Sequence, residues 1–234
     1  MTHFINTSPM RQKNNTLPLR PNVVGIVDCH RAIEIATRLP AGAVDFLEWR
    51  ADCLPVGIPL PRSRFPWLVT ARHPSEGGHG GLSPAARRKI LLHHLGGASA
   101  VDIEARSLHA MRDVVREARQ IGIPVIASFH DFEKTPSADR LQKIVRRATD
   151  AGADVLKVAT VPRSPADIAR LLGLFSDQNI PVAVMGMGRF GMATRVLFAS
   201  CGSVLNYGWL HRPNVPGQWS AVEFKRLLKR MGTR

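Results

Sequence analysis

Short apolar segments rich in β-branched residues alternate with longer amphipathic segments along almost the whole chain after residue 21. The short segments predict eight strands, at residues 23–27, 44–49, 67–71, 100–104, 125–128, 155–159, 182–185 and 203–205. The longer segments predict helices between most of these strands, at residues 84–95, 107–120, 138–151, 164–176, 192–200 and 220–231. Strands that alternate with helices form βαβ units, so the pattern predicts an α/β protein with a parallel sheet.

The number of units favours a closed barrel. Eight strands within residues 22–234 leave about 27 residues for each unit, which fits a (β/α)8 TIM barrel better than an open sheet. We therefore expect one catalytic domain over 22–234. The crossover at 53–64 is short and contains three prolines, so it is expected to lack a full helix.

Composition narrows the choice of partners. Hydrophobic residues make up 44% of the chain, and no apolar run is long enough to span a membrane. Lys and Arg number 32 against 18 Asp and Glu, which gives a net charge of +14. This sign suits a nucleic acid or a small anionic substrate. Because the basic residues are scattered and no recognition motif accompanies them, we expect a small anionic substrate, no nucleic acid and no membrane partner.

The termini and the cysteines bear on location. Residues 1–21 are polar and lack the apolar stretch of a secretory signal, so they predict a flexible tail, with an organellar transit peptide as the alternative. Cys29, Cys53 and Cys201 form no CxxC pair, which favours reduced thiols and a cytoplasmic location. No GxGxxG follows the first strand, and the adjacent His93 and His94 lack ligand spacing, so neither a cofactor nor a metal is expected.

Charged residues stand where the second to fourth predicted strands end, which in a barrel is the active-site face. Glu48 and Arg50 are two residues apart on one strand, so their side chains leave the same face and form either a substrate clamp or a structural ion pair. Arg72 follows the third strand and is suited to hold a carboxylate in bidentate geometry. Asp102 and Glu104 on the fourth strand are equally compatible with a structural or a catalytic role.

The fifth and sixth strands carry the two residues best suited to catalysis. His130 follows an apolar strand at the barrel mouth, where acid–base work and a structural role are both open. Lys157 lies in the middle of an apolar strand. Burial disfavours its charged form, and a neutral amine attacks ketones to give a Schiff base. The alternatives are pairing with a buried carboxylate such as Glu48, or a side chain that reaches out to solvent.

The last units supply candidates for lining and closing a site. Met185 precedes a Gly-Met-Gly segment, and Arg195 lies on the following helix. Tyr207 and the Pro-rich segment 213–218 come near the C-terminus, and this segment is either a closing loop or an ordinary turn. A cofactor-free enzyme with a lysine, a histidine and several arginines is the simplest interpretation.

In order along the chain, these segments resemble type I 3-dehydroquinate dehydratase, the Schiff-base dehydratase of the shikimate pathway of aromatic amino acid biosynthesis. The resemblance extends over nearly the whole chain after residue 21. Its most specific part is the His-Asp-Phe-x-Lys-Thr-Pro run that begins at His130, with Lys157 in the sixth strand. The other matching segments are Glu48-Trp49-Arg50-Ala51-Asp52, Arg72 with Glu76-Gly77-Gly78, Val101-Asp102-Ile103-Glu104, Met185-Gly186-Met187-Gly188, Arg195 and Pro216-Gly217-Gln218.

The resemblance implies a role for each residue. Lys157 forms the imine with the C3 ketone of 3-dehydroquinate, and Glu76 orients His130. His130 moves the C2 proton, assists departure of the C1 hydroxyl, and also assists formation and hydrolysis of the imine. Arg195 pairs with the substrate carboxylate. The remaining implied binding residues are Glu48, Arg50, Arg72, Met185, Tyr207, Asn214 and Gln218. The family also implies a homodimer.

This sequence departs from the family at one binding position and in two segments. Asn214 stands where the family usually has serine, which puts rate and specificity in question. The crossover at 53–64 is trimmed, and the polar tail is unlike that of the compact enzymes. The alternative hypothesis is a Schiff-base-forming paralogue that acts on another anionic cyclic keto acid.

Overall fold

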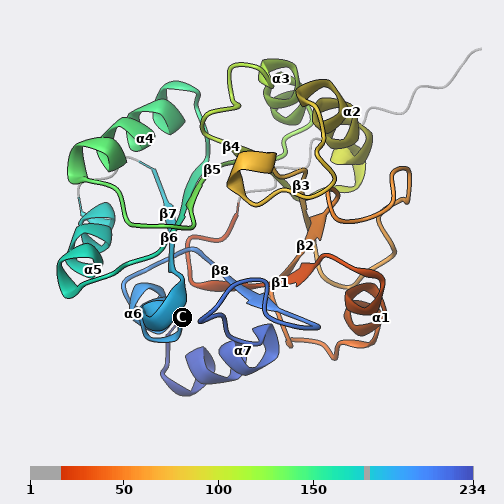
Figure 1. Cartoon of the computed structure of the whole chain (residues 1–234). Helices are drawn as coiled ribbons and strands as arrows, with labels where there is room; N and C mark the ends of the chain where they lie inside the picture. The colour runs from red at the N-terminus through yellow and green to blue at the C-terminus, as the bar shows by residue number, and fades with distance from the viewer. Residues whose placement is uncertain (1–16, 177–179, 234) are drawn as a thin grey trace, which may run out of the picture.

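Eight parallel strands surround one axis in the computed structural model, which describes residues 17–176 and 180–233 (Figure 1). Most of the expected N-terminal tail lies outside the described residues. The strands are β1 (Asn22–Val27), β2 (Phe46–Arg50), β3 (Trp67–Thr70), β4 (Ala100–Glu104), β5 (Val125–Asp131), β6 (Val155–Thr160), β7 (Val182–Gly186) and β8 (Leu205–Trp209). Their hydrogen-bonded order is β7-β6-β5-β4-β3-β2-β1-β8, all parallel. The predicted barrel class is confirmed.

A ring of helices covers the outside of the strands (Figure 1). The described helices are α1 (His30–Arg38), α2 (Pro84–His94), α3 (Arg112–Gln120), α4 (Ala138–Asp150), α5 (Pro165–Leu172), α6 (Gly191–Ser200) and α7 (Ala221–Arg230), with short 3-10 turns η1 (Pro74–Glu76), η2 (Leu95–Gly97), η3 (Gly173–Phe175) and η4 (Gly188–Phe190). The described residues 51–66 contain no helix between β2 and β3, as their prolines predict.

Serine side chains fix where several helices begin. The hydroxyls of Ser83, Ser137 and Ser220 each accept a backbone N–H from the first turn of α2, α4 and α7. Ser164 forms a capping box with Asp167 ahead of α5, with Pro165 at the first helical position, so this predicted helix start is confirmed. Each such cap contributes about 1 kcal/mol.

Three elements differ from the sequence-based expectation. α1 was not predicted, although Ala32 and Ala36 share its buried face, because small residues give a weak periodic signal. α3 begins at Arg112 rather than at 107, since Ser107 and Met111 form turns that lead into it. β8 begins at Leu205, because the expected first residue, Ser203, uses its hydroxyl to accept the Val184 N–H of β7.

Alternate residues of each strand point into the barrel, and their chemistry changes along the axis. At one level the inward residues are apolar, as with Phe46, Leu68, Ile126 and Val155, which pack together as an inner core. Two residues further along their strands stand Glu48, Thr70, Ser128 and Lys157, all buried. These polar side chains meet one another: Ser128 stands beside Lys157 in the strand register, the Thr70 hydroxyl donates to Glu48 at 2.9 Å, and Lys157 Nζ lies 3.4 Å from Glu48. The carboxyl ends of the strands therefore carry the buried polar groups.

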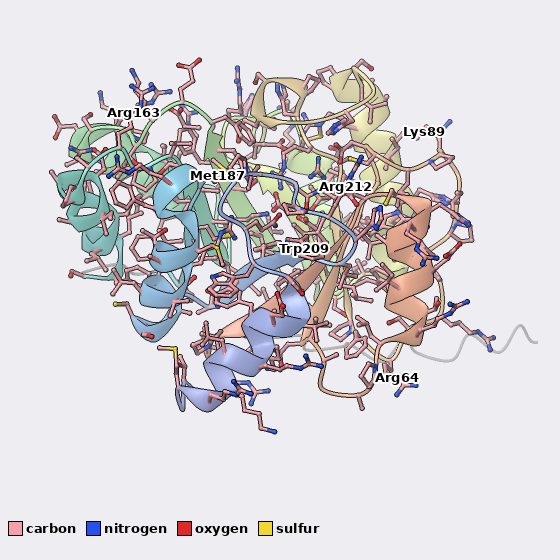
Figure 2. All side chains as sticks on the ribbon, turned by 60° about the horizontal axis from the view of Figure 1, so that its bottom comes forward. Arg64, Lys89, Arg163, Met187, Trp209 and Arg212 are labelled. Atoms are coloured by element: carbon pink, nitrogen blue, oxygen red, sulfur yellow. The ribbon has the colours of Figure 1, made fainter. Side chains whose placement is uncertain are left out.

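The barrel is closed by a ladder everywhere except between β7 and β8. Those two strands are the ends of the hydrogen-bonded order. The Ser203 hydroxyl accepts the Val184 N–H at 3.0 Å, and the Val204 N–H reaches Val182 O at 3.0 Å. In the described structure these bonds join β7 to the two residues that precede β8. Met187 and Arg212, which follow β7 and β8, lie at one end of the molecule, and Arg64, which precedes β3, lies toward the other (Figure 2).

Candidate active site

A small cavity lies at the carboxyl ends of the strands, with a volume of about 80 Å³. Every residue that the sequence analysis placed in a site lines it. These are Glu48, Arg50, Arg72, Glu76, His130, Lys157, Met185, Arg195, Tyr207, Asn214 and Gln218. Strand parity explains why the strand residues converge, because inward positions near the carboxyl ends of the strands face the same space. Glu76, Arg195 and the 214–218 segment reach the cavity from a turn, a helix and a loop.

Lys157 sits in the floor of this cavity and is 4% exposed. Its Nζ donates to Asp102 Oδ2 at 2.9 Å and lies 3.4 Å from Glu48 Oε1. The Tyr207 ring centroid is 3.8 Å from the same nitrogen. Pairing with a buried carboxylate, which the sequence left open for Lys157, is thus present in the described state. The two carboxylates fix the position of the amine and stabilise a positive charge there.

Arg72 holds a carboxylate in bidentate geometry, but the carboxylate belongs to the protein. Its two terminal nitrogens donate to Asp102 Oδ1 at 2.9 Å and Oδ2 at 3.0 Å, and one of them also contacts Glu104 at 3.2 Å. Burial alone would raise the pKa of Asp102, but the charges of Arg72 and Lys157 hold it far below its usual range. Arg72 therefore orients Asp102 behind Lys157, and its guanidinium is already engaged before any ligand enters.

A buried arginine that the sequence analysis did not single out completes this charge network. Arg87 of α2 is 1% exposed, donates to Ala71 O at 2.7 Å and pairs with Glu104. In sequence, Arg87 is one of several arginines on an amphipathic helix, and nothing there distinguishes it from its exposed neighbour Arg88. Asp102 and Glu104 are thus parts of a buried network, of which Asp102 alone touches Lys157.

His130 is anchored to Glu76 by two bonds. Glu76 Oε2 accepts the His130 backbone N–H at 2.9 Å and lies 3.1 Å from His130 Nδ1. When Nδ1–H is donated to the carboxylate, the lone pair of Nε2 is free, and Nε2 can act as a base. Burial and the nearby charges of Arg72 and Lys157 lower the pKa of His130 well below its ordinary value. The imidazole is therefore neutral near pH 7.

Burial and the charge of Glu104 raise the pKa of Glu76 to about 7, against 4.5 for the free side chain. Between these values the folded state binds a proton that the unfolded state has released. The stabilisation by the protonated carboxyl is complete below pH 4.5 and is lost as pH rises through about 7. We expect Glu76→Gln, which cannot ionise, to gain stability relative to the native protein over this window, by at most about 3 kcal/mol.

Urea unfolding of the native protein and Glu76→Gln between about pH 4.5 and 8 measures this change. Glu117→Gln, on the exposed face of α3, is the matched control and is expected to show no such trend. A stability difference between native protein and Glu76→Gln that stays constant with pH would contradict the raised pKa of Glu76.

Arg50 is held at the rim of the cavity by Asp52. Its Nε and one terminal nitrogen donate to the two Asp52 oxygens at 3.0 and 2.8 Å, and it also donates to Gly77 O at 3.1 Å. The second terminal nitrogen has no hydrogen-bond partner among the described residues, and Arg50 lines the cavity. Of the alternatives for Glu48 and Arg50, a direct ion pair between them is absent from the described contacts, since each is paired elsewhere.

Arg195 differs from the other buried arginines because no acidic side chain of the described residues pairs with it. It is 3% exposed, donates to Tyr207 O at 2.7 Å, and leaves its buried Nε without a partner. Burial lowers the pKa of Arg195 to about 10, so the guanidinium is still charged at neutral pH. The Tyr207 hydroxyl is also buried without a partner. This wall of the cavity therefore offers a cation and a hydroxyl to a ligand.

The loop between β8 and α7 covers the cavity. The loop packs closely against the start of α6, where two glycines meet. A Cβ at Gly191 would lie 2.6 Å from Gly217 O, and Gly217 has a φ of +75°. The Gln218 side chain accepts the Asn214 backbone N–H at 2.9 Å, and the Asn214 amide donates to Asp28. Asn214 is thus held away from the buried charges, at the exposed edge of the site. Lining residues without an individual prediction include Ile26 and Val215, whose apolar side chains gave no distinctive signal.

The arrangement brings together an amine, a neutral imidazole and a guanidinium without an acidic partner around one cavity. Such a set can form an imine with a ketone, move a proton on the neighbouring carbon, and bind an anionic group of the same ligand. No helix of the described residues is long and apolar enough to cross a membrane.

Comparison with known proteins gives consistent matches. A family model described as Type I 3-dehydroquinase matches residues 23–234. The chain is 33% identical over 207 residues to a 3-dehydroquinate dehydratase of Methanothrix thermoacetophila, covering 87% of this chain and 89% of that protein. A 3-dehydroquinate dehydratase of Latilactobacillus sakei is 32% identical, with coverage of 86% and 89%. The crystal structure of 3-dehydroquinate dehydratase from Geobacillus kaustophilus has a TM-score of 0.76 at 26% identity, covering 92% of this chain and 93% of that one.

Proposed function

The chain belongs to the type I 3-dehydroquinase family, and from this membership we propose that it converts 3-dehydroquinate to 3-dehydroshikimate through an imine on Lys157. The proposal rests on the cavity as well as on the family. The reaction needs a nucleophilic amine, a proton carrier and an anion site in one enclosed volume, and Lys157, His130 and Arg195 line the same cavity.

In the first stage, the Lys157 amine loses its proton and adds to the C3 carbonyl, and loss of water gives a protonated imine. This cation has the charge of the ammonium that it replaces, so Asp102 and Glu48 stabilise it at the same place. The imine withdraws electrons from the neighbouring carbon, which makes the C2 proton removable. Lys157 therefore acts as nucleophile and supplies the electron sink.

In the second stage, His130 takes the C2 proton through Nε2 and an enamine forms. The enamine electrons then expel the C1 hydroxyl, which leaves as water with a proton from His130. Hydrolysis of the product imine consumes one water and frees Lys157. Because imine formation releases one water and hydrolysis uses one, the net change is the loss of one water from the substrate. Glu76 keeps Nδ1 protonated and so acts as a positioning residue.

The observation that carries the proposal is the unpaired guanidinium of Arg195. A buried cation without a protein anion is costly, and the substrate carboxylate provides the missing partner. Met185, Tyr207 and His130 line the same cavity, and we propose that they contact the ring once its carboxylate is on Arg195. Glu48, Arg50, Gln218 and Asn214 are the proposed contacts for the ring hydroxyls, and Arg72 supports Glu48 and Asp102 from behind.

Intact-protein mass spectrometry after sodium borohydride treatment tests the imine. We expect a substrate-dependent covalent adduct on the native protein, because borohydride reduces the imine to a stable amine, and no adduct on Lys157→Ala. Absorbance of the enone product, followed in parallel, measures turnover. A folded native protein that turns over 3-dehydroquinate without any adduct would refute the imine, and turnover of other cyclic keto acids in preference to 3-dehydroquinate would favour the paralogue.

The family resemblance extends the proposal to the setting of the enzyme. We place it in the shikimate pathway of aromatic amino acid biosynthesis, in the cytoplasm, as a homodimer whose protomers each have one catalytic domain over 22–234. The three cysteines support a reducing compartment, because all three are free in the structure.

A further inference from the structure

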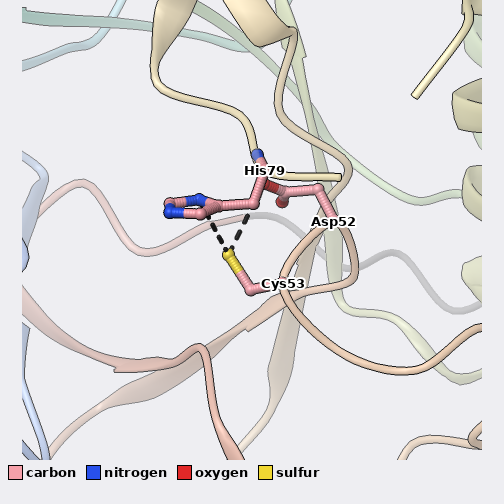
Figure 3. Close-up of side chains that lie close together, drawn as sticks. All are labelled: Asp52, Cys53 and His79. Carbon is pink, nitrogen blue, oxygen red and sulfur yellow. Dashed lines mark hydrogen bonds between the residues drawn. The ribbon is translucent and has the colours of Figure 1, made fainter. Parts of the chain in front are cut away.

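A thiol, an imidazole and a carboxylate meet outside the cavity, in two loops that are far apart in sequence (Figure 3). Asp52 and Cys53 follow β2, and His79 lies in the Gly-rich segment after η1. Cys53 Sγ lies 3.4 Å from His79 Nδ1 and 3.6 Å from Asp52 Oδ2, and the three ligand atoms all lie within 4.8 Å of one another. The sequence analysis found no metal spacing here, because 26 residues separate Cys53 from His79.

We propose that Asp52, Cys53 and His79 bind one thiophilic divalent cation, Zn²⁺ above all. In tetrahedral zinc sites the Zn–S bond is about 2.3 Å and the bonds to N and O are about 2.0–2.1 Å, so the ligand atoms stand roughly 3.5 Å apart. The two distances from Sγ, 3.4 and 3.6 Å, match that edge. Thiolate and imidazole are also the ligands that favour zinc over magnesium or calcium.

Solvent can reach the site, and each of the three ligand atoms can donate a lone pair to a metal. Cys53 is half-buried and His79 is exposed, so an ion can enter and water can take the fourth position. On binding, the Cys53 thiol gives its proton to solvent, and its sulfur and His79 Nδ1 each donate a lone pair to the metal. Asp52 Oδ2 donates the lone pair that accepts the Arg50 N–H in the metal-free protein, so that hydrogen bond breaks. No oxidation or reduction takes part. Asp52 is already oriented by the His79 backbone N–H, which donates to Oδ2 at 3.0 Å.

The site is coupled to the cavity through Arg50. Asp52 Oδ2, the oxygen that faces Cys53, also accepts a bond of 2.8 Å from the Arg50 guanidinium. A cation on this oxygen repels the guanidinium and competes for the lone pairs that hold it. We therefore infer that Zn²⁺ at this site weakens the position of Arg50 and inhibits the enzyme. Inhibition rests on the proposed function, whereas binding of the metal does not.

Cobalt substitution tests the binding directly. We expect the native protein to bind one equivalent of Co²⁺ with a near-ultraviolet thiolate-to-cobalt charge-transfer band, and Zn²⁺ to displace it. Cys53→Ser and His79→Ala are expected to lose the band and to weaken metal affinity more than roughly 100-fold, since even groups that only orient a ligand contribute 10–100-fold. Cys201→Ser, which removes an exposed thiol elsewhere, is the matched control and keeps the band.

Absence of the band in the native protein, its persistence in Cys53→Ser, or its loss in Cys201→Ser would overturn the site. Zn²⁺ titrated into the turnover assay tests the coupling separately. We expect kcat/KM of the native protein to fall about tenfold at saturation and to return on chelation, because the metal displaces only one of the substrate-binding groups. Cys53→Ser is expected to resist Zn²⁺. A cobalt band with no effect of Zn²⁺ on turnover would refute the coupling to Arg50.

Discussion

Replacement of Lys157 by alanine is expected to lower kcat for dehydration of 3-dehydroquinate by roughly 10⁴-fold or more, because loss of a covalent nucleophile removes the whole imine route. The effect comes from chemistry and not from substrate binding, since Arg195 and the other lining residues remain. The substrate Kd, measured by calorimetry on the variant, is therefore expected to change far less than kcat.

Lys157→Arg separates the chemistry from the buried charge. Alanine leaves Glu48 and Asp102 without the cation that lies 3.4 and 2.9 Å from them, which destabilises the barrel as well as removing the nucleophile. Arginine keeps a positive charge there but forms no imine with a ketone. We expect Lys157→Arg to unfold close to the native temperature and to be as inactive as Lys157→Ala. Substantial turnover by folded Lys157→Arg would show that the amine is not the nucleophile.

Replacement of His130 by alanine is expected to lower kcat by roughly 10²–10⁴-fold, the range of positioned acid–base groups. The mass adduct formed with borohydride is expected to persist, because Lys157 remains in place and the imine accumulates when its C2 proton is not removed. The combination of a slow turnover and a retained adduct distinguishes proton transfer from imine formation in the role of His130.

His73→Ala is the matched control for this variant. His73 lies on the same rim, where its Nδ1 accepts the Ser75 N–H at 3.1 Å, but it does not line the cavity. We expect it to turn over at close to the native rate. Loss of the adduct together with activity in His130→Ala would mean that His130 is needed before the imine forms, and would contradict a role limited to the C2 proton and the C1 hydroxyl.

The inward face of each strand could be predicted because it follows from local parity. Glu48 and Lys157 stand two residues beyond the apolar, inward Phe46 and Val155, and this spacing can be counted in the sequence. His130 lies two residues beyond Ser128, which is inward by the same count. Barrel closure brings the inward strand positions together, and the strand residues of the predicted site line one cavity for this reason.

The sequence could not predict in the same way which carboxylate pairs with which buried arginine. Arg72 has the right place and chemistry for a substrate carboxylate, yet Asp102 and Glu104 of the neighbouring strand occupy its guanidinium. Which carboxylate reaches it depends on strand register and side-chain length together. Arg87 arrives from a helix, and Cys53 meets His79 across two loops, so neither contact leaves a periodic signal in the sequence.

The buried guanidinium of Arg195 has no acidic partner among the described residues, and under the proposed function the substrate supplies one. An apolar side chain of similar length, such as methionine, would fill the same space without needing an anion, so a barrel optimised for stability alone would not place a charge there. The empty enzyme is therefore held below the stability that its architecture allows. Under the proposed function, the substrate carboxylate is the acidic partner that Arg195 lacks among the described residues, so binding of the substrate also stabilises the folded barrel.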